Sequence, residues 1–132
     1  MNSIQKAALY MRLSKEDLDK GNAESESIQN QRMILDEYAS SHGWEIYDHY
    51  IDEDFSGSDR SRPDFNRMIE DAKNGKFNIV LVKTQSRFAR DIKVVEDYIH
   101  NLFKEKKIRF VSALEGIDTM RSDSELSSHI HA

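Results

Sequence analysis

The sequence of 132 residues contains no cysteine and only one proline. The absence of cysteine excludes disulfides, thiol catalysis and metal sites with cysteine ligands. The longest apolar runs are a few residues, far short of the roughly 20 residues that a membrane-spanning helix needs, and the N-terminus lacks a signal-peptide core. The five histidines follow no recognisable metal-ligand spacing. We therefore expect a soluble, cytoplasmic protein with no membrane contact and no bound metal.

The chain has fewer basic than acidic residues, and its net charge is -5. Duplex DNA binding is driven largely by lysine and arginine side chains that displace counterions from phosphates. The chain alone is therefore expected to bind DNA poorly. Either the substrate is not DNA, or another segment supplies the affinity.

The hydrophobic content of 38% is sufficient for one core between a sheet and helices. Apolar and β-branched runs predict strands and periodic apolar stripes predict helices. The expected strands are 6–13, 44–51, 79–82 and 108–111, and the expected helices are 27–41, 63–75 and 91–106. This alternation predicts an α/β fold, with a mostly parallel sheet of four to five strands covered by helices on both faces. The continuous apolar run 79–82 is expected to be the central strand.

The segments between these elements are polar. Residues 15–24 predict a loop, and Ser25 or Ser27 is available as the N-cap of the helix that follows. An acidic, glycine-containing loop is expected at 52–59. After Gly116 we expect a loop that leads into a further helix.

Candidate functional residues follow the ends of three predicted strands. They are Ser14, the segment 52–62 and the segment 83–90. In open parallel sheets, ligands bind outside the carboxyl ends of the strands, so these residues are expected to meet at one edge. Arg12 lies two residues before Ser14 and shares its face if the strand continues that far. A hydroxyl nucleophile beside guanidinium groups suits attack on a phosphodiester.

Structural roles for the same residues remain open. Ser14 could cap a short helical turn, because Ser14 and Asp17 have capping-box spacing. Arg87 and Arg90 are expected to share a face at the start of a helix, where Asp91 could cap the helix or pair with either arginine. Surface ion pairs are the alternative for the three arginines. The available partners are Asp54, Asp91 and Glu96 for Arg87 and Arg90, and Asp59 or Asp64 for Arg62.

Several short motifs occur in an order that resembles a known family. They are Tyr-x-Arg-Leu-Ser ending at Ser14, Ser-Ile-Gln-Asn-Gln at 27–31, Asp-Glu-Asp-Phe-Ser-Gly at 52–57, Arg62-Pro63, and Ser-Arg-x-x-Arg at 86–90. Together they resemble the catalytic domain of serine site-specific recombinases, over nearly the whole chain. The long insert between Ser14 and Gln29 is more similar to the large serine recombinases and transposases than to the compact resolvases.

The resemblance implies a function and a role for each matched residue. Ser14 would attack the scissile phosphate of double-stranded DNA and form a 5′-phosphoserine link. The phosphate would be surrounded by Arg12, Arg62, Arg87 and Arg90, with Gln29 and Asp52 in support. No cofactor is implied. Ser86 stands where many resolvases have an aspartate, which leaves Asp52 or solvent as the proton acceptor.

The resemblance also implies partners and a domain boundary. Recombinases of this family act as homodimers that form tetramers, in some cases with a directionality factor. Residues 1–132 would be the catalytic domain, ending before the long dimerisation helix and the DNA-binding domain of the family. Such a fragment is expected to have little recombination activity alone.

Other functions fit parts of the sequence. A receiver-like binding module would place Asp52 in an acidic loop, but it needs acids near the end of the first strand, where Arg12 and Ser14 lie. A small phosphate-ester hydrolase could use Ser14 and the arginines. An inactive remnant that only dimerises is the third possibility.

Overall fold

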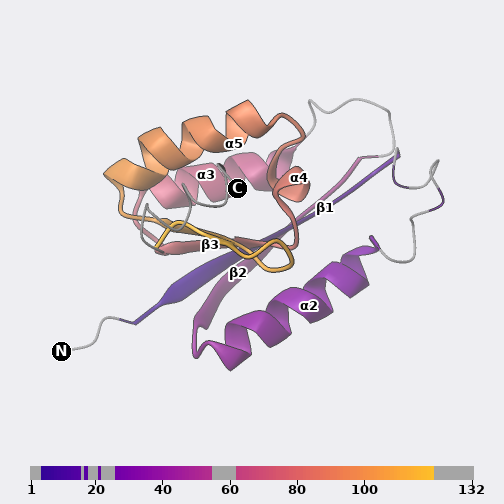
Figure 1. Cartoon of the computed structure of the whole chain (residues 1–132), viewed down its shortest axis with the longest axis horizontal. Helices are drawn as coiled ribbons and strands as arrows, with labels where there is room; N and C mark the ends of the chain where they lie inside the picture. The colour runs from indigo at the N-terminus through magenta and orange to yellow at the C-terminus, as the bar shows by residue number, and fades with distance from the viewer. Residues whose placement is uncertain (1–3, 16, 18–20, 22–25, 55–61, 121–132) are drawn as a thin grey trace, which may run out of the picture.

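The computed structural model of the chain describes residues 4–15, 17, 21, 26–54 and 62–120 (Figure 1). Its elements are β1 (Lys6–Ser14), α2 (Ile28–Ser41), β2 (Glu45–Asp54), α3 (Pro63–Lys73), β3 (Ile79–Val82), α4 (Gln85–Phe88), α5 (Ile92–Tyr98), the π-helical turn η1 (Ile99–Phe103), β4 (Arg109–Ser112) and β5 (Ile117–Asp118). Most of the predicted loop 15–24, residues 55–59 of the predicted acidic loop and the helix predicted near the C-terminus lie outside the described residues.

The strands form one sheet in the order β2-β1-β3-β4-β5. All neighbours pair in parallel except β4 and β5, which are antiparallel. The predicted α/β class is confirmed, and β3 is the central strand as expected. The sequence prediction placed a loop where β5 lies, because two residues are too few to show a strand periodicity. An ion pair between Arg109 and Asp118, at 2.6 Å, holds β5 against β4.

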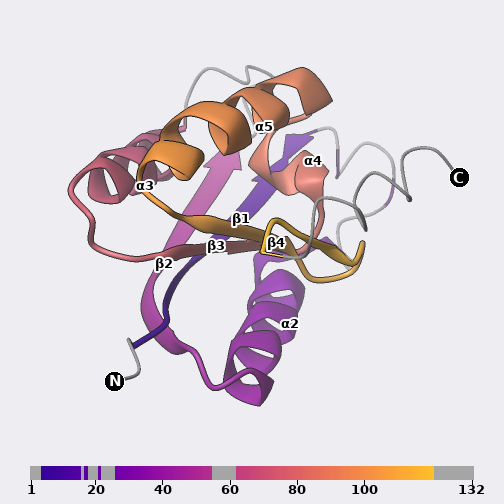
Figure 2. The same cartoon turned by 60° about the vertical axis from the view of Figure 1, so that its left-hand side comes forward.

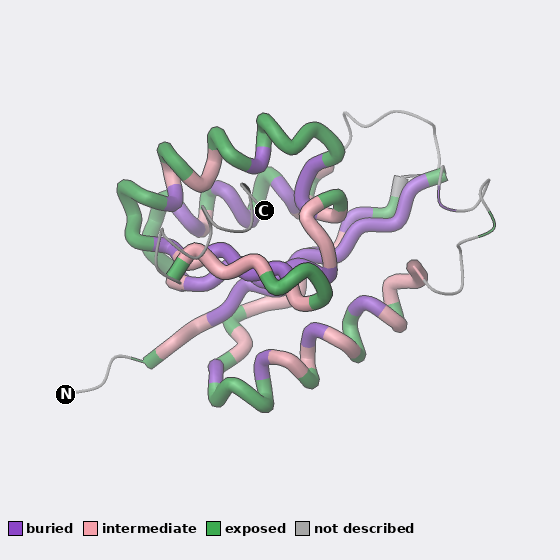
Figure 3. Tube along the Cα trace, in the orientation of Figure 1, coloured by how far each residue is buried: buried purple, intermediate pink, exposed green. Residues whose placement is uncertain are grey.

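Helices cover both faces of the sheet. Figures 1 and 2 show α2 below the sheet, with α3 and α5 above it. Alternate residues of β1 divide between two apolar clusters, since Ala8 and Tyr10 pack with the α3 and α5 residues while Leu9 and Met11 pack with α2. The burial map in Figure 3 shows that β1 is buried along most of its length.

Local sequence signals explain most of the helix ends. Ser27 is the N-cap of α2, and its side chain accepts a hydrogen bond from Asn30 N at 3.0 Å. Gly43, just beyond the helix, has a φ of +72°, a left-handed conformation that glycine adopts without a Cβ clash. Asp91 caps α5 through Lys93 N, which is one of the roles expected for it.

Two predicted helices differ in detail. The region predicted as one helix, 91–106, begins as α5 and continues as the π-helical turn η1. The short helix α4 was not predicted. It ends at Phe88, and Ala89 is extended with a φ of −159°. Arg87 and Arg90 therefore do not lie on one helix, contrary to the expectation from their spacing.

The lengths of the strands position the candidate site. β3 pairs with β1 only as far as Leu9, whereas β2 remains paired with β1 up to Ser14 and Asp54. At this end the sheet therefore narrows to the two strands β1 and β2. The space beside β1, beyond the end of β3, is taken by α4, which packs on β1 (Figure 1).

Candidate active site

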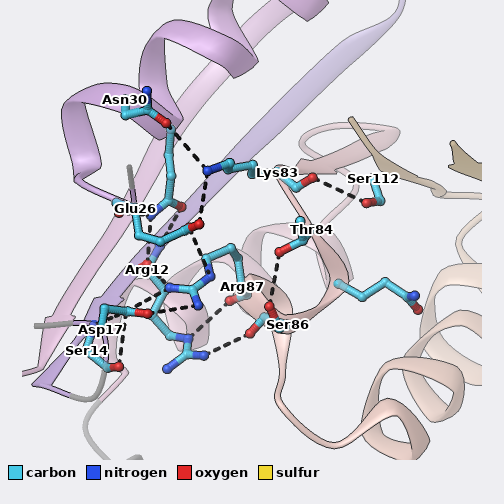
Figure 4. A network of polar contacts seen from close by, with 12 residues as sticks. Arg12, Ser14, Asp17, Glu26, Asn30, Lys83, Thr84, Ser86, Arg87 and Ser112 are labelled. Atoms are coloured by element: carbon cyan, nitrogen blue, oxygen red, sulfur yellow. Dashed lines mark hydrogen bonds and ion pairs between the residues drawn. The ribbon is translucent and has the colours of Figure 1, made fainter. Parts of the chain in front are cut away.

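Ser14 is the last residue of β1, and it is only 6% exposed. Because the strand continues to this point, Arg12 and Ser14 lie on the same face, as expected. The Ser14 N–H and the Ser14 hydroxyl both donate to Asp17 Oδ2, at 2.8 and 3.1 Å (Figure 4). The bond from Ser14 N–H to the acid three residues later is the half of a capping box that Asp17 supplies, whereas the Ser14 hydroxyl donates to the same carboxylate.

Arg12 connects β1 to α4. Its Nη2 donates to the carbonyl of Ser86 at 2.8 Å, and its Nε donates to the carbonyl of Arg87 at 3.3 Å. The residue is 6% exposed. These bonds fix the guanidinium of Arg12 beside the strand end that carries Ser14.

Arg87 of α4 reaches back toward the same strand end. Its Nη1 and Nη2 donate to the two carboxylate oxygens of Asp17, at 2.9 and 3.1 Å, and Nη1 also donates to the Arg12 carbonyl at 2.8 Å. Glu26 lies 3.8 Å from its Nε. The surface ion pairs considered from the sequence gave other acids as partners of Arg87, whereas the structure places this arginine in a nearly buried network (Figure 4).

Charge interactions link Arg12 to the three other candidate arginines, of which Arg90 is exposed. Burial, followed by the positive charges of Arg87 and Arg62, lowers the pKa of the Arg12 guanidinium, and Arg90 acts in the same direction. An arginine remains charged after such a shift because its ordinary pKa is far above neutrality. We call Arg12, Arg62, Arg87 and Arg90 the arginine cluster.

Arg62 approaches from the start of α3. Its Nε and Nη2 donate to the Tyr10 hydroxyl at 3.2 and 3.1 Å, and Nη2 also donates to the Phe88 carbonyl. The guanidinium carbon lies 3.8 Å from the centre of the Phe65 ring, a cation–π distance. Of the two surface partners expected from the sequence, Asp59 lies outside the described residues, and Asp64 pairs with Arg67. The described contacts of Arg62 are with Tyr10, Phe65 and Phe88.

Asp52 has a different place from the one predicted. It lies within β2, which runs to Asp54, and not in a loop. It is 3% exposed and accepts hydrogen bonds from the Tyr10 hydroxyl at 2.7 Å and from the backbone N–H groups of Asp64 and Phe65 at 3.0 and 2.9 Å. Asp52 therefore caps the start of α3, where Arg62 at the N-cap position makes no capping bond. Through Tyr10 it also orients Arg62.

Gln29 is exposed on α2, and no contact with Ser14 is seen for it among the described residues. Its neighbour Gln31, for which the sequence analysis gave no separate role, is fully buried. The side chain of Gln31 accepts from Arg12 N at 3.2 Å and donates to the Arg12 carbonyl at 2.9 Å. The residue of this motif that supports β1 is therefore Gln31.

Three charged residues of the network have roles that only the structure shows. From the sequence, Asp17 is expected only as a capping partner, Lys83 only as part of the segment 83–90, and Glu26 has no expected role. Lys83 is 8% exposed in its side chain and forms an ion pair with Glu26 at 3.1 Å, which joins the start of α2 to the end of β3. The one sequence signal for this ion pair is the position of Lys83 directly after the apolar strand 79–82.

Among the described residues, no group of three or more histidine, aspartate or glutamate side chains could hold a metal ion. No helix in the same residues is long and apolar enough to cross a bilayer.

Comparisons with known proteins agree with this geometry. The family model for the resolvase N-terminal domain matches residues 7–132. The crystal structure of the N-terminal catalytic domain of TP901-1 integrase is 33% identical with a TM-score of 0.78, covering 96% of this chain and 90% of that one. A resolvase family site-specific recombinase from Streptococcus pneumoniae is 28% identical with a TM-score of 0.71, covering 96% and 85%.

A relative in Bacillus phage phi105 is named as uncharacterized immunity region protein 3. It is 35% identical over 74 residues, which are 56% of this chain and 87% of the relative. The family match spans nearly all of the sheet and every residue of the arginine cluster. The chain therefore belongs to the resolvase N-terminal domain family, and its fold is that of a serine recombinase catalytic domain.

Proposed function

We propose that the chain cuts and rejoins double-stranded DNA, with Ser14 as the nucleophile. The Ser14 oxygen forms a bond to the scissile phosphorus as the bond from phosphorus to the 3′ oxygen breaks. The products are a 5′-phosphoserine ester and a free 3′-hydroxyl. The serine loses one proton and the 3′ oxygen gains one, with water as the exchange partner. The reverse reaction reseals the strand, because the ester retains the bond energy.

One observation carries this proposal: the Ser14 hydroxyl shares the Asp17 carboxylate with the Arg87 guanidinium, at the strand end where Arg12 lies on the same face. Phosphoryl transfer depends on fixed positive charge around the equatorial oxygens of the phosphorus. Arg12 and Arg87 are held by backbone carbonyls and by Asp17, and Arg62 is held by Tyr10. Such groups need little reorganisation as negative charge develops.

The next question is which group accepts the proton of the Ser14 hydroxyl. Solvent is proposed as the acceptor, because the Asp52 oxygens already accept from Tyr10, Asp64 and Phe65. Asp17, which accepts from the Ser14 hydroxyl, is paired with Arg87. Asp52 and Tyr10 are instead proposed to orient Arg62. Gln31, rather than Gln29, is proposed to hold the backbone of Arg12.

The partners are part of the proposal. By likeness to the family, the active form is proposed to be a tetramer built from homodimers, in some cases with a directionality factor. The net charge of -5 indicates weak DNA affinity for these 132 residues alone. A test of the chemistry therefore needs an added DNA-binding domain that raises the local DNA concentration.

The experiment fuses the chain to a DNA-binding domain of known site. The substrate is a pool of nicked duplexes that carry randomised sequence beside that site, so that a cut strand is lost and the covalent product accumulates. Protein–DNA adducts are separated on denaturing gels, and the modified peptide is mapped by mass spectrometry. We expect phosphoserine at Ser14 and no adduct with Ser14→Ala.

Ser41→Ala is the matched control, since Ser41 is an exposed serine at the end of α2. It should form adduct at the wild-type rate. An adduct that survives Ser14→Ala, or a phosphoserine at another position, contradicts the assignment of Ser14. An activated aryl phosphate tests the hydrolase alternative, because turnover of that substrate is not expected of a recombinase.

A further inference from the structure

The Asp17 carboxylate lies on the groups that are proposed to bind the scissile phosphate. It accepts hydrogen bonds from Ser14 N–H, from the Ser14 hydroxyl and from both terminal nitrogens of Arg87. All four distances are between 2.8 and 3.1 Å. Figure 4 shows the carboxylate between the end of β1 and the guanidinium of Arg87.

These donors are typical of a phosphate site. A guanidinium binds two oxygens of a phosphate or a carboxylate with the same forked geometry, and backbone N–H and hydroxyl groups complete many anion sites. A phosphodiester presents two unesterified oxygens and one negative charge, as a carboxylate does. Asp17 therefore resembles the proposed substrate in charge and in hydrogen-bonding pattern.

The site has little room for a second anion. Ser14 is 6% exposed, and the side chains of Arg87 and Asp17 are 11% and 8% exposed. A phosphate that reaches the Ser14 oxygen must therefore displace the Asp17 carboxylate. The pKa of Asp17 is informative: burial acts to raise it, but the hydrogen bonds from Arg87 and Ser14 outweigh burial and lower it. The carboxylate is thus ionised at neutral pH.

We propose that Asp17 is an internal competitor of the scissile phosphate, which occupies its site until DNA displaces it. This inference rests on the proposed function, because the phosphodiester is taken as the ligand. When phosphate enters, it takes over Arg87 and the Ser14 N–H, and the Ser14 hydroxyl loses its bond to Asp17. The nucleophile is released by the same event that brings its target.

An unused donor in the site supports this reading. Arg87 Nε is buried and has no hydrogen-bond partner in the part of the chain that the structure describes. The nearest acid, Glu26, lies 3.8 Å away and is paired with Lys83 at 3.1 Å. This Nε is therefore a donor that could bond to an additional oxygen of an entering phosphate.

The simpler alternative is that Asp17 only stabilises the turn after β1. In that case its removal lowers stability, because Arg87 loses its buried partner, and it raises anion affinity no more than the loss of another acid does. The two readings differ in anion binding. That quantity can be measured without DNA cleavage.

The experiment measures binding of inorganic phosphate to the 132-residue chain at constant ionic strength. Binding is followed by the amide NMR signal of Ser14 and by thermal unfolding. Asp17→Asn removes the charge and keeps the size. We expect it to bind phosphate at least about 10-fold more tightly than the wild type, a typical coupling between competing ligands.

Asp97→Asn is the matched control, because Asp97 is exposed on α5 and the change in net charge is the same. It should bind phosphate as the wild type does. Equal affinity of Asp17→Asn and the wild type overturns the proposal, as does an equal gain in both variants. Asp17→Glu keeps the charge and should remain close to the wild type, so affinity as tight as that of Asp17→Asn also overturns it.

A second measurement uses only the wild type, so it does not depend on whether the Asp17 variants fold. Saturating phosphate should shift the Ser14 amide signal, since that N–H changes partner, and shifts confined to other residues contradict the proposal. Failure here is distinct from failure of the proposed function. Adduct formation at Ser14 decides the function, whereas phosphate binding decides the competition.

Discussion

The side-chain amide of Gln31 pairs with the backbone of Arg12 in both directions, as a neighbouring strand does. β3 pairs with β1 only up to Leu9, so Gln31 supplies hydrogen bonds to β1 after its strand neighbour has ended. The backbone position of Arg12 in turn sets the position of Ser14, two residues further along the strand. Gln31, a fully buried residue of α2, thus helps to position the candidate site through the backbone of Arg12.

Gln31→Met should therefore lower the free energy of unfolding. Methionine has a similar volume but leaves Arg12 N–H buried without its partner, which costs about 1–3 kcal/mol. The measurement is urea unfolding followed by circular dichroism. Gln29→Met is the control, because Gln29 is exposed on the same helix and should change stability by less than about 0.5 kcal/mol. Equal stability of the two variants contradicts the role given to Gln31.

Asp52→Asn tests the capping of α3. An asparagine has one acceptor oxygen where the carboxylate serves three donors, and its NH2 group faces donors. We expect a loss of about 2–3 kcal/mol in the free energy of unfolding, as for hydrogen bonds to a charged group. Chemical denaturation measures it, with Asp97→Asn as a control for the change in charge. A loss no larger than the control's indicates that Asp52 is not the cap.

Stability should fall in the alkaline range because of Tyr10. Burial, together with the bond to Asp52, raises the pKa of Tyr10 above its ordinary value of 10, although the charge of Arg62 acts to lower it. Above pH 10, the unfolded chain loses this proton while the folded chain keeps it. The folded state then binds more protons, so the free energy of unfolding decreases as pH rises. Below pH 10 the contribution is fully present.

Unfolding of the wild type and of Tyr10→Phe between pH 8 and 11 checks this sign, in the pH range set by the ordinary tyrosine pKa of about 10. The variant should show a shallower decline, since phenylalanine does not titrate. Phenolate absorbance of the folded protein provides a second readout. A steeper decline in the variant is the opposite of the expected result.

Arg87→Lys separates charge from geometry in the proposed reaction. Lysine keeps the positive charge but cannot form the two-point contact of a guanidinium. We expect adduct formation to slow by about 100-fold, as when a preorganised anion-stabilising donor is lost. The rate is measured as the formation of protein–DNA adduct by the chain fused to a DNA-binding domain. Arg67→Lys is the matched control, because Arg67 forms an exposed ion pair with Asp48, and it should react at the wild-type rate.

Much of the fold could be predicted because its signals are local. The apolar run 79–82 and the stripe on α3 each depend on a few neighbouring residues, and both elements lie where the sequence placed them. The proximity of Ser14, Arg12 and Arg87 could also be predicted, since carboxyl ends of parallel strands meet at one edge. Helix α4 could not, because four residues carry no periodicity.

The buried polar residues Gln31 and Asp52, which hold the site residues in place, could not be predicted for a different reason. Whether Gln29 or Gln31 faces β1 depends on the rotation of α2, which sequence spacing fixes only by its apolar stripe. Asp52 was read as part of an acidic loop because charged residues rarely lie within buried strands. Asp52 can be buried because the Tyr10 hydroxyl and the backbone at the start of α3 donate hydrogen bonds to it, and these contacts are known only from the structure.

The early end of β3 has a consequence for amide exchange along β1. Residues up to Leu9 have strand neighbours on both sides, whereas Ser14 has β2 on one side only. Local opening therefore costs less at the Ser14 end, and its backbone protons should exchange with solvent sooner than those of Ala8. The proposed nucleophile therefore lies on the part of β1 that should open most easily, whereas the part between β2 and β3 stays fixed within the apolar layers.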